Sequence, residues 1–64
     1  MKYIKGFRQA VSAIIDDLEL RCPGWTNEML RTDRALASNL RLAHISTYGA
    51  EAVDAAIEFL SRPE

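Results

Sequence analysis

The chain has 64 residues, a hydrophobic fraction of 48% and a formal net charge of −1. Such a chain holds one ordered domain at most, spanning 1–64, and has no general attraction to nucleic acid or acidic lipid. No segment approaches the roughly 18 consecutive apolar residues of a membrane span, and Lys5 and Arg8 interrupt the first apolar run too early for a signal peptide. We expect a complete small protein that neither spans nor enters a membrane.

Small size and a single cysteine together favour a partner subunit. Domains this short bury little surface and usually gain stability from disulfides, a metal or a partner. Cys22 is the only cysteine and His44 the only histidine, so we expect no internal disulfide, no four-ligand zinc site and no cofactor. An unpaired thiol is typical of a reducing compartment. We therefore expect a cytoplasmic protein that associates with a partner.

The first predicted helix covers about 3–20. Its apolar residues fall at alternating steps of three and four, which is typical of a helix with one buried face. These residues are Ile4, Phe7, Val11, Ile14 and Leu18, with Tyr3 and Ile15 beside them. Gly6 weakens the first turn by about 1 kcal/mol relative to alanine, so an extended start over 1–4 is the alternative.

The charges of this first helix are arranged against its dipole. The basic residues Lys2, Lys5 and Arg8 lie near its amino end, and the acidic residues Asp16, Asp17 and Glu19 lie near its carboxyl end. One interpretation is a solvated face on which water and salt screen the charges. The other is antiparallel pairing with a second copy of the helix, which sets each basic end beside an acidic end. The second interpretation predicts a homodimer.

The second predicted helix covers 27–45. Residues 22–24, with the sequence Cys-Pro-Gly, end the first helix because proline disfavours helix at the residue before it. Thr26 is a suitable N-cap, and Trp25 and Leu30 have the spacing of a hydrophobic staple. The apolar stripe of the helix consists of Met29, Leu36, Leu40 and Ala43.

Asp33 and His44 interrupt this stripe, since residues 33, 37, 40 and 44 lie along one strip of a continuous helix. Eleven residues span roughly 16 Å, so the two side chains cannot pair within that helix. In one interpretation Asp33 or Thr32 caps a local helix start and His44 is half-exposed. In the other, the strip is an antiparallel dimer interface in which Asp33 of one chain approaches His44 of the other and fixes the register.

The third predicted helix covers 48–61 and follows a break at 46–49. Its inner stripe is formed by Val53, Ala56, Ile57 and Leu60, with Ala52 and Phe59 at the margins. An acidic outer strip of Glu51, Asp54 and Glu58 can pair with an arginine flank of the second helix, formed by Arg31, Arg34 and Arg41. Alternatively, the arginine flank binds a carboxylate-rich or phosphate-bearing partner.

Residues 32–49 also resemble a DNA-binding helix-turn-helix. Leu36, Ala37 and Leu40 stand where the first helix of that motif places core residues, and Leu42 fits the position after the turn. The resemblance implies a DNA-binding regulator in which Asp33 is a helix-start residue. A net charge of −1 makes this the alternative function, because phosphate attraction is missing.

The preferred prediction is a small all-α, three-helix bundle, completed by dimerisation, that binds a partner protein stoichiometrically. Catalysis is not expected, because the chain offers neither paired carboxylates in an evident cleft nor a glycine-rich phosphate loop. Phage and mobile-element accessory or inhibitor proteins are a class that acts by such occlusion. The predicted interface residues are Asp33, His44, Leu40, Trp25, Arg31, Arg34, Arg41 and Tyr48.

Overall fold

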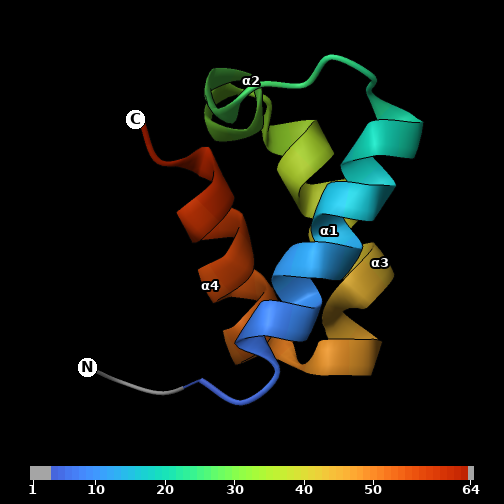
Figure 1. Ribbon diagram of the computed structural model, residues 1–64, viewed down its shortest axis with the longest axis vertical. Coiled ribbons are helices and arrows are strands. Elements are labelled where there is room, and N and C mark those ends of the chain that lie inside the picture. The colour runs from blue at the N-terminus through green and yellow to red at the C-terminus, as the bar shows by residue number, and fades with distance from the viewer. Residues whose placement is uncertain (1–3, 64) are drawn as a thin grey trace.

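The computed structural model describes residues 4–63, which form four helices and no strand. The helices are α1 (Phe7–Arg21), α2 (Asn27–Thr32), α3 (Arg34–Tyr48) and α4 (Ala50–Ser61). In Figure 1, α1 and α4 run side by side in the same direction, α3 runs opposite to both, and α2 lies across one end. The prediction of a small all-α bundle is confirmed. Within the described range no helix is long and apolar enough to cross a bilayer.

The first helix begins later than the apolar pattern suggests. Gly6 takes the left-handed conformation, with φ of 84°, directly before α1. The Phe7 amide donates to the Ile4 carbonyl at 3.1 Å, so residues 4–7 form a turn rather than a helical start. Residue 3 and most of the alternative extended start lie outside the described residues. At the other end, α1 stops at Arg21, one residue later than predicted, as expected before proline.

The single helix predicted over 27–45 is wrong, because the chain breaks at Asp33. This residue is extended, with φ of −92° and ψ of 93°, and its side chain accepts a hydrogen bond from the Leu36 amide at 3.0 Å. Asp33 is therefore the N-cap of α3, which matches the first of the two interpretations of this residue. Thr26 caps α2 as predicted, accepting from the Met29 amide at 3.1 Å.

A single residue, Gly49, separates α3 from α4. Its φ of 91° is a conformation that side chains with a Cβ rarely adopt. Gly49 ends α3, so this helix continues to Tyr48, three residues beyond the predicted end at 45. The helix after it falls within the predicted range of 48–61.

The core lies between α4 and the three other helices, all of which it contacts. The buried residues are Ala10, Ile14, Leu18, Leu30, Leu40, Ala52, Val53, Ala56 and Leu60. In α2 the buried position is Leu30, whereas Met29 is 37% exposed, and Ala43 of α3 is exposed. Both differences follow from the break, because α2 and α3 turn separate faces to the core and do not share one stripe.

Candidate protein-interaction surface

His44 and Asp33, predicted to meet across a dimer, are both satisfied within one chain. Asp33 caps α3, and His44 Nε2 lies 2.8 Å from Asp17 Oδ2 of α1. The side chains of His44 and Asp17 are 18% and 20% exposed. Because an ionised carboxylate only accepts hydrogen bonds, Nε2 of His44 carries the hydrogen. Neither side chain therefore needs a polar partner from a second chain, which was the argument for pairing Asp33 with His44 between chains.

Arg21 completes this polar cluster at the α1–α3 joint. It donates from Nε to Asp17 Oδ1 at 2.9 Å. That hydrogen bond is the main influence that holds the pKa of Asp17 below its usual range; partial burial opposes it and the hydrogen bond from His44 assists it. The cluster closes the outer edge of the joint between α1 and α3.

The predicted apolar and aromatic interface residues belong mainly to the core or its margin. Leu40 is fully buried within the chain, so the structure corrects its assignment from an interface residue to a core residue. Trp25 is partly buried against the core, and its Nε1 donates to Glu19 Oε2 at 2.9 Å. Tyr48 also packs on the core, with its ring 6.3 Å from that of His44.

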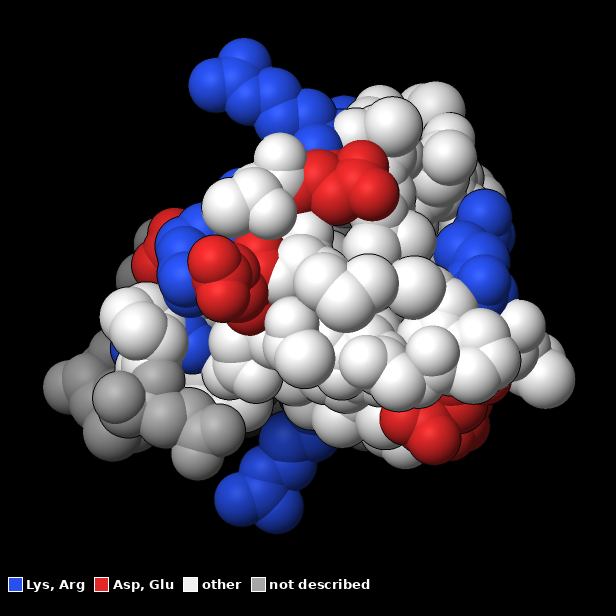
Figure 2. Space-filling view, turned by 90° about the horizontal axis from the view of Figure 1, so that it is seen from above, with Lys and Arg blue, Asp and Glu red and all other residues white. Residues whose placement is uncertain are grey.

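The three arginines of the predicted flank have different surroundings, and Arg41 makes the expected pairing with the acidic strip. Arg31 donates to the Ser61 carbonyl at 2.9 Å, which ties α2 to the carboxyl end of α4. Arg41 donates to Asp54 Oδ1 at 2.7 Å, and this contact raises the pKa of the guanidinium. Arg34 is exposed beside the α2–α3 break. Figure 2 looks onto the end of the bundle near α2, where charged groups surround a broad uncharged area instead of forming one basic face.

The helix-turn-helix resemblance has no counterpart in the backbone of residues 32–49. That motif requires a turn near Arg41, but α3 runs without a break from Arg34 to Tyr48. Basic side chains are also sparse on α3: Arg34 is exposed at the first residue of the helix, and Arg41 is partly buried and bound to Asp54. This helix therefore offers neither the geometry nor the charge of a DNA-reading helix.

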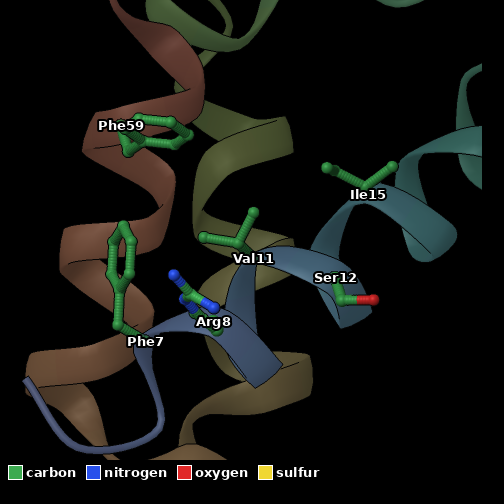
Figure 3. A pocket seen from close by; sticks show the side chains of 6 residues that line it. All are labelled: Phe7, Arg8, Val11, Ser12, Ile15 and Phe59. Carbon is green, nitrogen blue, oxygen red and sulfur yellow. The ribbon is translucent and has the colours of Figure 1, made fainter.

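An apolar groove with a volume of about 370 Å³ lies between α1 and α4. We call it the α1–α4 groove; it is lined by Phe7, Arg8, Val11, Ser12, Ile15 and Phe59 (Figure 3). The rings of Phe7 and Phe59 meet edge to face, with centroids 5.7 Å apart. Phe59 is nevertheless 50% exposed. The groove is thus an open strip of apolar side chains from two neighbouring helices.

Sequence reasoning did not identify the groove, although each of its apolar residues was noticed. Ile15 and Phe59 were expected at the margins of two buried stripes. A stripe that is wider than one neighbouring helix can cover leaves its margin exposed. The excess width of the two stripes was the signal that some apolar side chains would stay exposed. The sequence does not show which of them, because that depends on which helices become neighbours.

The exposed faces of α4 and α1 carry different charges. The outer face of α4 is acidic, with Glu51, Asp54 and Glu58 exposed. Asp54 binds Arg41, and Glu58 binds Arg62 at 3.3 Å. On α1 the exposed face is mixed and includes Arg8, Ser12, Asp16 and Glu19.

The side chains that line the groove include no His, Cys, Asp or Glu. Among residues 4–63 no three His, Cys, Asp or Glu side chains gather closely enough to hold a metal ion. The Cys22 thiol is free and partly buried in the turn after α1, away from the residues that line the groove. Comparisons with protein families, with curated proteins and with solved structures found no match to this chain.

Proposed function

We propose that this chain is a non-enzymatic protein-interaction module that binds another polypeptide through the α1–α4 groove. The observation that carries the proposal is one open apolar strip, in which the half-exposed Phe59 adjoins the partly buried Phe7, Val11 and Ile15. Exposed apolar patches rimmed by polar side chains are typical of protein–protein interaction sites. Aromatic residues at the centre of such a surface are typical of binding hot spots.

The shape of the groove favours a helix as the bound element. An open strip between two roughly parallel helices accepts the apolar face of a third helix, whose residues at i, i+3, i+4 and i+7 fill it. Small-molecule sites, by contrast, enclose most of their ligand. Binding of this kind occludes a surface of the partner and needs no bond-making chemistry, which is the mode of action of stoichiometric accessory and inhibitor proteins. The free thiol of Cys22 suits a reducing compartment such as the cytoplasm.

A pair of serine-to-lysine variants tests the proposal. Ser12 lines the groove, whereas Ser38 lies on the exposed face of α3, and both positions are helical. Lysine has a better helix propensity than serine, so both variants should fold as the wild type does. The long charged side chain at position 12 would cover the groove and leave the rest of the surface unchanged.

The measurement is retention of proteins, including a tagged second copy of this chain, from a lysate of the producing cell on immobilised bait. We expect a polypeptide that wild type and Ser38→Lys retain and that Ser12→Lys retains about tenfold less, as for loss of a central contact. Equal retention of every protein by the three baits would overturn the proposal. Circular dichroism of each bait confirms that its helices are intact.

A further inference from the structure

We propose that the groove is occupied by a second copy of this chain, packed so that the two α1 helices run antiparallel about a two-fold axis at Ser12. This inference rests on the proposed function, because it uses the same surface, and it names the partner. It differs from the dimer expected through residues 33 and 44, whose polar groups the structure satisfies internally.

The charge pattern on the outer face of α1 is self-complementary. When a second copy runs antiparallel to the first, each basic residue of the pattern meets an acidic residue of the other copy. Arg8, Ser12 and Asp16 are spaced by four residues, so they lie along one strip, and all three are exposed. A two-fold axis at Ser12 places Arg8 of each copy beside Asp16 of the other. A two-fold contact repeats every interaction, so one matching pair forms two ion pairs.

Arg8 and Asp16 have no ion-pair partner among the described residues of their own chain. They cannot pair with each other, because eight residues along a helix span about 12 Å. Their neighbour Asp17 is already held by Arg21 and His44. The α1 charges that remain unpaired on the strip are therefore the ones that an antiparallel copy would match.

Lys5 and Glu19 carry further opposite charges near the two ends of α1. They lie seven residues before and after Ser12, and both are exposed. Oε2 of Glu19 accepts from Trp25 at 2.9 Å, and the second carboxylate oxygen is left for another donor. Lys5 lies in the turn before α1, so the helical register does not fix its position, but the antiparallel arrangement sets the end of α1 that carries Lys5 beside the end that carries Glu19.

The apolar residues explain why this contact would hold together. Ser12 is small enough for the two α1 helices to approach closely at the axis. The exposed parts of Val11, Ile15 and Phe59 adjoin that strip on its α4 side. Because a two-fold axis perpendicular to α1 leaves both grooves on the same side of the helix pair, the two grooves merge into one apolar contact. Surface ion pairs alone contribute little, so the apolar part supplies affinity and the charges set direction and register.

Charge reversal gives a sharp test. Arg8→Glu sets two acidic residues together at both contacts, and Asp16→Arg sets two basic residues together. The double variant restores attraction with exchanged signs. Either single reversal also improves the match with the α1 dipole, so the variants should fold at least as well as the wild type. A single variant that folds but no longer dimerises would then show that the contact between the two α1 helices has been lost.

The measurement is sedimentation equilibrium over about 1 to 500 μM, a range that covers micromolar to submillimolar dissociation constants. We expect the wild type to dimerise, each single variant to dimerise about tenfold or more weakly, and the double variant to return within about threefold of wild type. Added salt should weaken the wild-type dimer and strengthen the single variants, since it screens both attraction and repulsion. A monomeric wild type, a dimer indifferent to Arg8→Glu, or a double variant no better than the singles would overturn the inference.

The serine pair separates failure of this inference from failure of the proposed function. A second copy in the groove predicts that Ser12→Lys is monomeric and that Ser38→Lys dimerises as the wild type does. A monomeric wild type that retains a foreign polypeptide, lost in Ser12→Lys, would overturn the homodimer and leave the proposed function standing. If Ser12→Lys changed neither dimerisation nor the retention of another polypeptide, both the homodimer and the proposed function would be overturned.

Discussion

The two flanks of α1 differ in how they meet their neighbours. Toward α3, the joint ends in Asp17, His44 and Arg21, which satisfy one another within the chain. Toward α4, the rings of Phe7 and Phe59 meet edge to face, with Phe7 partly buried and Phe59 50% exposed. One helix therefore has a closed flank and an open flank.

The comparison separates residues that hold the fold from residues that are available to a partner. A polar cluster that is complete within the chain gains nothing from a partner and would lose hydrogen bonds if one displaced it. An apolar strip exposed to water gains free energy from any surface that covers it. Substitutions on the closed flank should therefore affect stability, and substitutions on the open flank should affect association.

The largest effect on the free energy of unfolding is expected in the core, beneath the closed flank. Leu40→Ala removes a fully buried side chain from α3, and such truncations cost about 2–5 kcal/mol. A domain of this size has little more stability than that, so chemical denaturation followed by circular dichroism should show a largely unfolded variant. Leu42→Ala is the control, because Leu42 is 67% exposed and should change stability by less than about 0.5 kcal/mol. Similar losses at both positions would contradict the assigned faces of α3.

Removal of the helix cap at the break between α2 and α3 should have the next largest effect on stability. Asp33→Ala removes the side-chain acceptor for the Leu36 amide and should destabilise the domain by about 1 kcal/mol. Asp33→Asn keeps an acceptor and should recover most of that loss. Arg34→Ala is the matched control at the next position, with an expected change below about 0.5 kcal/mol. A stability of Asp33→Ala equal to that of the wild type in urea would argue against the capped break.

A smaller effect is expected for pH dependence at the closed flank. The folded chain holds the pKa of Asp17 below its usual range, chiefly through the hydrogen bond from Arg21, so the ionised carboxylate favours folding. This contribution is fully present above the ordinary aspartate pKa and disappears as pH falls through the lower folded value, that is, below about pH 4. It should amount to less than about 1 kcal/mol, because the pair is close to the surface.

The measurement for Asp17 compares the wild type with Asp17→Asn in thermal unfolding from neutral pH down to about pH 2.5. The wild type should lose its advantage over the variant as the acid protonates Asp17. Parallel curves throughout that range would show that Asp17 contributes no pH-dependent stability, and the polar cluster would then not distinguish the two flanks.

The smallest effect on stability, together with the largest on association, is expected at the open flank. Ser12→Lys changes an exposed helical residue and should alter the free energy of unfolding by less than about 0.5 kcal/mol. The same substitution should abolish the association described above. A variant that loses stability and association together would mean that the open flank also holds the fold, and the comparison would fail.

Local signals in the sequence predicted much of the architecture. The Cys-Pro-Gly turn, the Thr26 cap and the last helix are each specified by residues within a few positions of one another. The structure contains all three, although the last helix covers Ala50–Ser61 instead of 48–61. Asp33 was the ambiguous position. It can either cap a helix locally or interrupt a buried strip, and these alternatives predicted one helix or two.

The candidate site was harder to predict, because its parts are far apart in the chain. Phe7 and Phe59 are 52 positions apart in the sequence, and nothing near either residue indicates that their rings meet. Similarly, His44 was paired with Asp33 of a second chain, although its partner is Asp17 of its own chain. Periodicity shows that a side chain lies on an apolar or polar face of its helix, but it does not show which helix that face meets.

The sequence by itself determined the all-helical class, the turn after α1 and the self-complementary order of charges on α1, because these depend on neighbouring residues and on the helical period. Only the tertiary structure decided which apolar residues are covered. Packing α3 against one side of α1 and α4 against the other buries Leu40 and leaves Phe59 half-exposed. Coverage depends on the arrangement of whole helices, and so the closed and the open flank of α1 became distinguishable only in the folded chain.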